Sequence, residues 1–264
     1  MQFRFLSAPS QARLVFALLL AACVSSAGDI DDLDDAAARL QYAFYTADVR
    51  GLQDVLNSIQ GLEMDLPASA KEYQLAYGSW KLAQLYADPG SQRSPVPHAG
   101  SLAGKAAEQC VKHAHAAIDQ DARNAEAYAL EAVCSGMPQG FFRLVGASGG
   151  GCDKSKSLRT ALELAPSDPR VQLIQAMCTT ARLGKAADNV AKWSAVVAAF
   201  ESAPPSAPGK PDWGHVEALT LLGESYLQRG EAVPARDAIE RALVLAPDYR
   251  QAQRVLDAAA ARPR

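Results

Sequence analysis

Apolar residues recur along most of the chain at the spacing of one helix face. In residues 216–249, large side chains stand at Leu219, Leu222, Tyr226 and Ile239, three or four residues apart within each half. The same kind of spacing continues on both sides and predicts eleven helices. Their expected ranges are 31–46, 49–61, 68–86, 101–119, 124–136, 153–165, 169–183, 185–201, 214–229, 231–245 and 248–260.

Two stretches indicate that a helix–turn–helix joint is repeated. Residues 117–134 and 161–178 each begin with alanine, run without a gap and end on cysteine. Within 216–249, Gly223, Ala235 and Ala242 place small residues where two helices would approach closely. Gly230 and Pro247 follow the two helices, and these residue types end helices. The chain is therefore expected to be built from successive helix pairs.

The 34 residues of 216–249 resemble the tetratricopeptide repeat (TPR), with large residues at positions 4, 7, 11 and 24, small ones at 8, 20 and 27, and proline at 32. The resemblance implies an all-α fold, a right-handed α-solenoid of antiparallel helix pairs with about 10 or 11 helices. It extends over about 100–260 and more loosely over 31–100. The best repeats are expected at 101–134, 124–168, 169–201 and 216–249.

Composition agrees with a helical protein. The chain is 49% apolar but only 7% aromatic, and alanine is abundant, which favours close-packed helices over strands. The net charge is −3 and no run rich in lysine or arginine is present. Nucleic acid is therefore not expected among its partners.

The first residues have the pattern of an export signal. Arg4 and Arg13 precede an apolar run that is too short to span a bilayer. "LAAC" ending at Cys23 resembles a bacterial lipobox, which predicts a signal peptide over 1–22, lipidation of Cys23, a tether over 23–30 and a helical domain over 31–263. Cleavage after Ala27 is the alternative. The expected location is the periplasm, with a lipid anchor in the outer membrane or, after cleavage at Ala27, in soluble form.

Without Cys23, four of the five cysteines remain, an even number for an oxidising compartment. In the repeat register, Cys134 and Cys178 lie late in first helices, whereas Cys110 and Cys152 lie early in the preceding second helices. That register predicts the disulfides Cys110–Cys134 and Cys152–Cys178. Cys134–Cys152 is the rival pairing, and four free thiols are the remaining alternative.

Candidate chemistry is sparse. The loop "GASGGGCDKS" differs from a phosphate-binding loop because Cys152 and Asp153 precede Lys154 and no strand is expected before it. His113 and His115 are two apart on a helix and point to different sides. The acids in residues 29–37 lack the glycine and glutamate of a calcium loop. We expect no metal, no cofactor and no catalytic site.

The resemblance implies a concave groove lined by positions 2, 5, 9 and 12 of each first helix. The predicted lining residues are Glu126, Val133, Arg170, Leu173, Met177, Glu217, Thr220 and Glu224. This mixture of small apolar and charged side chains suits an extended peptide or a neighbouring subunit. Phe141 and Phe142, in the loop 135–151, either pack into the groove or contact a partner.

The expected function is a non-catalytic scaffold that binds another protein of the bacterial cell envelope in this groove. The membrane would be contacted only through the lipid anchor. The alternative is a helical-repeat lipoprotein that captures a small molecule for an uptake system. An enzyme would need an acid–base or metal constellation that the sequence does not offer.

Overall fold

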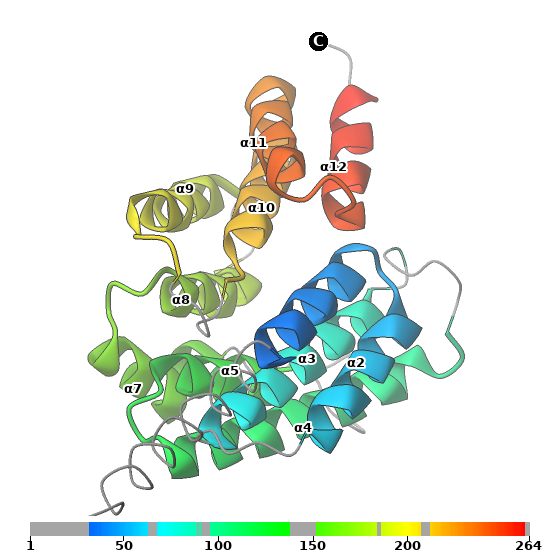
Figure 1. The fold of residues 1–264 in the computed structure, drawn as a ribbon. Coiled ribbons are helices and arrows are strands. Elements are labelled where there is room, and N and C mark those ends of the chain that lie inside the picture. Colours follow the sequence, from blue (N-terminus) through cyan, green and yellow to red (C-terminus); the bar gives the residue numbers. More distant parts are fainter. Residues whose placement is uncertain are drawn as a thin grey trace, which may run out of the picture.

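The computed structural model describes residues 32–62, 68–88, 90, 96–137, 152–183, 186–206 and 212–261. Every regular element in these ranges is a helix, which confirms the all-α prediction (Figure 1). The elements are a helix over 32–45 (the 32–45 helix), α2 (Val49–Gly61), α3 (Ala68–Ala87), α4 (Ala99–Gln120), α5 (Ala125–Ser135), the short 3₁₀ turn η1 (Cys152–Lys154), α7 (Lys156–Leu164), α8 (Pro169–Leu183), α9 (Ala186–Ser202), α10 (His215–Gln228), α11 (Ala232–Leu245) and α12 (Arg250–Ala260).

The helices form a solenoid of antiparallel pairs (Figure 1). From α2 to α5 and from α7 to α12, each helix packs on the next one in the chain. First helices of neighbouring pairs also touch, because α3 packs on α5 and α5 packs on α8. This stacking of pair on pair is the arrangement expected of TPR-like repeats.

Short polar residues start several of the helices. Asp48 accepts a hydrogen bond from the backbone N–H of Gly51 at 2.9 Å, and Asn124 accepts one from Ala127 at 3.0 Å. Such N-caps satisfy amide groups that have no partner inside the helix. They fix where α2 and α5 begin.

Small residues allow the close helix contacts that the repeat pattern predicts. A Cβ atom added to Gly223 of α10 would lie 2.6 Å from Ile239 of α11, and one added to Gly78 of α3 would lie 2.5 Å from Leu40. Ala235 and Ala242 of α11 are completely buried. Larger side chains at these positions would force the helices apart.

Two disulfides staple successive pairs. Cys110 of α4 is bonded to Cys134 of α5, and Cys152 of η1 is bonded to Cys178 of α8. These are the two pairs that the repeat register predicts. Cys152 lies in the 3₁₀ turn before α7, whereas Cys110 lies within α4.

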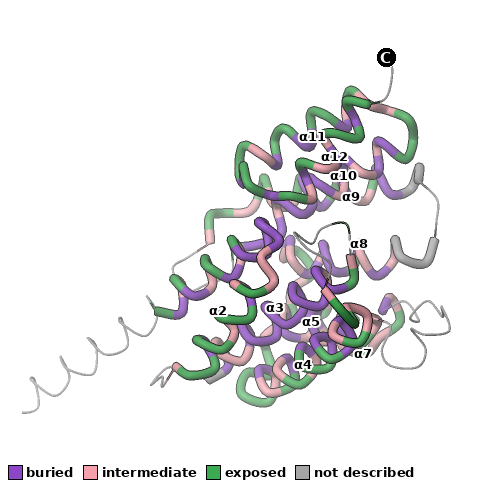
Figure 2. Tube along the Cα trace, turned by 90° about the vertical axis from the view of Figure 1, so that its right-hand side faces the viewer, coloured by how far each residue is buried: buried purple, intermediate pink, exposed green. Residues whose placement is uncertain are grey.

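The two ends of the solenoid meet. The 32–45 helix and α3 face α10 and the start of α12, and the ring of Tyr249 lies 4.7 Å from that of Tyr45 and 5.9 Å from that of Phe44. Residues 73–83 of α3 are all buried, so this helix is covered on every side (Figure 2). The inner face of the stack is therefore filled by the 32–45 helix and α3, which we call the N-terminal helices.

Candidate functional site

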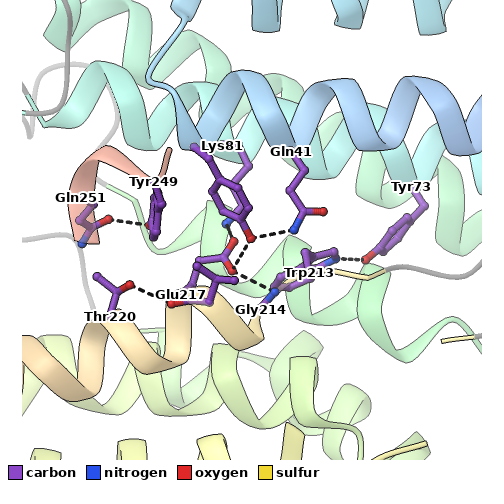
Figure 3. Close-up of polar contacts among 11 residues, drawn as sticks. Gln41, Tyr73, Lys81, Trp213, Gly214, Glu217, Thr220, Tyr249 and Gln251 are labelled. Atoms are coloured by element: carbon purple, nitrogen blue, oxygen red, sulfur yellow. Dashed lines mark hydrogen bonds and ion pairs between the residues drawn. The ribbon is translucent and has the colours of Figure 1, made fainter. Parts of the chain in front are cut away.

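A buried ion pair lies at the centre of the inner face. Nζ of Lys81 on α3 is 3.0 Å from Oε1 of Glu217 on α10, and the two residues are 0% and 6% exposed (Figure 3). Charged side chains are almost never buried unless they are paired. The pair therefore requires the N-terminal helices and α10 to be in contact.

Aromatic rings surround the ammonium group of Lys81. Its Nζ lies 4.1 Å from the centre of the Trp80 ring, 4.3 Å from Phe44 and within 5.5 Å of Tyr77 and Trp213. Ring faces carry negative charge density and attract a cation at these distances. Burial lowers the pKa of Lys81, and the carboxylate of Glu217 opposes that effect. The cage and the carboxylate together replace the water that the ammonium group has lost.

The second oxygen of Glu217 fixes the start of α10. Oε2 accepts hydrogen bonds from the N–H of Gly214 at 3.0 Å and from the hydroxyl of Tyr45 at 3.3 Å. Gly214 has a φ of +110°, a conformation that side-chain-bearing residues rarely adopt. One glutamate thus serves as an ion-pair partner and as the cap of its own helix.

A second buried set of polar contacts links Trp213, which precedes α10, to Arg170 on α8. The indole N–H of Trp213 donates to the hydroxyl of Tyr73 at 2.8 Å, and that hydroxyl donates to Oε2 of Glu126 at 2.6 Å. Nε of Arg170 lies 3.1 Å from the same oxygen. Burial raises the pKa of Glu126, and the guanidinium group of Arg170 opposes it. These contacts join α3, α5, α8 and the segment before α10.

A third set of contacts joins α10 to α12. The side-chain amide of Gln251 donates to Glu224 at 2.8 Å and accepts from the hydroxyl of Tyr249 at 2.9 Å. Burial raises the pKa of Glu224. Nη2 of Arg254 lies 2.7 Å from Asp88, which follows α3. The start of α12 is thus held to both α10 and α3.

The predicted groove is mostly closed. Leu173 and Thr220 are 0% exposed, and Val133 and Glu217 are also buried. The expectation that these four side chains line an open groove does not hold in the described structure, since all four are buried. Glu217 is covered by Lys81 and Tyr45 of the N-terminal helices, whereas Leu173 lies close to Gly214, just before α10. Glu126, Arg170, Met177 and Glu224 are partly exposed, and the three charged ones already have partners within the chain.

The described residues hold no group of three or more His, Cys, Asp or Glu side chains that could bind a metal ion. Within the same ranges, no helix is both long and apolar enough to cross a bilayer. His113 contacts Glu72 at 2.7 Å and His115 contacts Glu131 at 2.9 Å, so each pairs with a separate acid. Cys23, Phe141 and Phe142 lie outside the described residues.

An apolar pocket opens between the 32–45 helix and the end of α11. It has a volume of about 280 Å³, and Ala38, Tyr42, Leu245 and Pro247 surround it as exposed residues that we name the Tyr42 patch. Tyr42 is 59% and Leu245 is 54% exposed. Sequence reasoning missed this patch because its two sides are about 200 residues apart.

A second pocket of about 260 Å³ lies between the ends of the 32–45 helix and α3 and the start of α12, where Tyr249 lines it. A third, polar pocket of about 280 Å³ includes Glu126, Tyr73 and Asp168. Of the predicted groove residues, Glu126 alone is among those that line these three pockets.

No protein family profile and no curated protein matches the chain. Among solved structures it is similar to YrrB, described as a TPR protein with an unusual peptide-binding site, with 14% identity over 80% of this chain and 93% of that one and a TM-score of 0.36. It is also similar to a monomeric mutant of IFIT1 with Gppp-AAAA, with 13% identity over 89% of this chain and 61% of that one and a TM-score of 0.38.

Proposed function

We propose that this chain is a non-catalytic scaffold of the bacterial cell envelope and that it binds a partner protein through the Tyr42 patch. The proposal keeps the function expected from the repeats but moves the binding surface from the buried groove positions to this exposed patch. It rests on one observation, the exposed apolar side chains grouped around the pocket between the 32–45 helix and α11.

The chemistry of the patch suits a protein. Exposed apolar side chains around a pocket mark interaction surfaces, because water must otherwise order around them. Tyrosine is among the residues that contribute most to binding energy at interfaces. Asp248 lies at the edge of the pocket and can provide the polar rim that interfaces have. A partner that inserts one apolar side chain beside Tyr42 and Leu245 would bury all of these groups.

The envelope location is supported by the sequence. "LAAC" at 20–23 follows a short apolar run, and the two disulfides suit an oxidising compartment. Lipidation at Cys23 would attach the domain to the membrane through residues 23–30. A Cys23→Ala variant should lose the mass of the acyl groups and leave the detergent phase. An unchanged mass would contradict lipidation but would leave partner binding untouched.

Charge substitution in the patch tests partner binding. The variants Tyr42→Lys and Leu245→Lys would be crosslinked in intact envelopes and compared with Val233→Lys, a matched control on the same helix as Leu245. Val233 is 76% exposed and lies at the opposite end of α11, so its substitution tests charge and expression without touching the pocket. We expect a crosslinked partner to be lost in the two patch variants and retained in the control. Equal crosslinking in all three would refute the site.

A further inference from the structure

The third of the pockets described above, which we name the polar pocket, lies where several helices begin. Its lining comes from the first turn of the 32–45 helix, from residues 69–74 of α3, from residues 121–126 at the start of α5 and from Asp168, which immediately precedes α8. Most of these side chains are polar or charged, and the volume of about 280 Å³ is close to the lower limit of small-molecule sites. The polar pocket shares no described residue with the Tyr42 patch. Its chemistry therefore suits a small polar ligand.

One buried amide group of the lining has no partner. Gln74 on α3 is 8% exposed, and its side chain makes no hydrogen bond with any of the described residues. Its polar atoms are not among the fully enclosed ones, in contrast to the side-chain oxygen of Gln84 on the same helix. A buried polar group without a partner is costly, and each one calls for an explanation. A ligand in the polar pocket can reach the amide of Gln74 and would satisfy it.

The carboxylates of the lining each use only one oxygen within the described part of the chain. Oε2 of Glu126 is held by Tyr73 and Arg170. Oδ1 of Asp168 accepts from two backbone N–H groups at the start of α8, and Oδ1 of Asp121 accepts from one in the joint before α5. The side chain of Glu126 is 15% exposed, so it is not sealed from the pocket. An ionised carboxylate only accepts hydrogen bonds, so the lining suits a ligand that carries donors.

Negative charge exceeds positive charge around the polar pocket. Three acids line it against one arginine, Arg123, which is exposed. Arg170 compensates one of these acids, but Asp32 and Asp34 flank the lining residue Leu33 along the chain and add two more. A hollow lined mainly by one sign of charge concentrates ions of the other sign. The polar pocket therefore attracts a cation.

An organic cation suits this lining better than a metal ion. In the described part of the chain, no three acids gather closely enough to hold a metal. An ammonium group has three N–H donors, which can reach acceptors on different sides of a pocket. We infer that the polar pocket binds a small aliphatic molecule with one or two ammonium groups, which donate to Glu126, Asp168 and the amide oxygen of Gln74. This site is separate from the proposed protein-binding patch.

The probes 1,4-diaminobutane and 1,4-butanediol form a matched pair, since they have the same chain length and differ in charge. Titration calorimetry on the disulfide-bonded chain near neutral pH should give about tenfold tighter binding of the diamine, because a hydrogen bond to a charged group has at least that effect. Added salt should weaken the binding of the diamine but not that of the diol. Equal affinities, or no heat of binding from the diamine, would overturn the inference.

Two variants and a matched control test the residues. Asp168→Asn removes one charge but keeps a side-chain oxygen that can cap α8, and Gln74→Leu removes the buried amide group. Each should weaken the binding of the diamine by about fivefold. Asp257→Asn removes an exposed charge on α12, outside the lining, and should leave the affinity unchanged. Thermal unfolding checks that each variant is folded, and affinities equal to that of the control in both pocket variants would refute the site.

Side-chain amide NMR locates the bound diamine. The signal of Gln74, assigned by its absence in Gln74→Leu, should shift when the diamine is added. The signal of Gln84 on the same helix should not shift, because Gln84 lies outside the lining of the polar pocket. A shift at Gln84 alone, or no shift at Gln74 in a sample that binds the diamine, would place the amine elsewhere and overturn the inference.

Discussion

Lys81 on α3 and Glu217 on α10 form a buried ion pair across 136 residues of sequence, with 3.0 Å between Nζ and Oε1. Both charges have lost their water, and each depends on the other for compensation. The pair therefore reports directly on whether the N-terminal helices occupy the inner face.

Replacing Lys81 with methionine should destabilise the protein by about 3–5 kcal/mol, because the carboxylate of Glu217 would stay buried without its counter-charge. Urea unfolding followed by circular dichroism measures the loss. The matched control is Arg39→Met, which breaks an ion pair with Asp35 whose side chains are 57% and 68% exposed. Such surface pairs contribute little, so the control should change stability by less than about 1 kcal/mol. Similar losses in both variants would contradict the burial of Lys81.

The double variant Lys81→Met with Glu217→Gln should lose less stability than the sum of the two single variants. Glutamine keeps an oxygen that can accept from Gly214 but removes the unpaired charge. Residues in direct contact give coupling energies of about 0.5–3 kcal/mol in such a cycle. Additive losses would mean that the two side chains do not interact in solution.

Alkaline pH should unfold the protein steeply. Burial raises the pKa of Tyr45, Tyr73, Tyr77 and Tyr249. Above about pH 10 an unfolded tyrosine loses its proton while a buried one keeps it, so the folded state binds more protons and stability falls as pH rises. Four such groups give a slope of up to about 5 kcal/mol per pH unit.

Lys81 acts with the opposite sign. Its pKa is lowered in the folded state, so its contribution to stability improves with rising pH until the unfolded lysine also loses its proton near its ordinary value of 10.5. Above that pH the tyrosines alone determine the slope. Absorbance at about 295 nm should therefore report tyrosine ionisation at the same pH at which helicity is lost. Ionisation of all tyrosines near pH 10 with full helicity retained would contradict their burial.

Gly214→Ala should be much more harmful than Gly230→Ala. Both glycines have positive φ, +110° and +82°, so alanine is strained at either position. At Gly214 the added Cβ would also lie 2.5 Å from the Phe200 ring, whereas at Gly230 nothing lies within 4 Å. We expect losses of about 3 kcal/mol or more and about 1 kcal/mol, respectively, in thermal or urea unfolding. Equal losses would indicate that α10 starts differently.

Removal of either disulfide should cost about 3 kcal/mol on the chain-entropy model, since the two bonds span 24 and 26 residues. The double variants Cys110→Ser/Cys134→Ser and Cys152→Ser/Cys178→Ser can be compared with the native chain by thermal unfolding. Reductant should lower the melting temperature of the native chain and of each double variant. A melting temperature insensitive to reductant would show that the thiols are free.

The helices and the two disulfides could be predicted from the sequence because they depend on residues in the same helix or in neighbouring helices. Helix boundaries follow from apolar spacing and from joints such as Gly230 and Pro247. The cysteine pairs follow from the repeat register, since Cys134 and Cys178 occupy equivalent positions. Each of these inferences relates a residue only to its own helix or to a neighbouring one.

The filled inner face could not be predicted in this way. Nothing in the repeat register relates Tyr45 to Tyr249 or Lys81 to Glu217, because these contacts join pairs far apart in the stack. One signal was present, however. The segment from Tyr73 to Leu85 is largely apolar around its whole circumference, and such a helix is buried on every side. Lys81 within it was the indication of a buried partner.

The meeting of the two ends has a consequence for folding. In an open repeat array each unit depends only on its neighbours, so terminal units can fray and shortened arrays can still fold. Here the contact of Tyr45 with Tyr249 links the first described helix to the last. Deleting either terminal element would uncover the aromatic interior, so the chain should lose the modularity of a linear array and unfold in a single all-or-none transition.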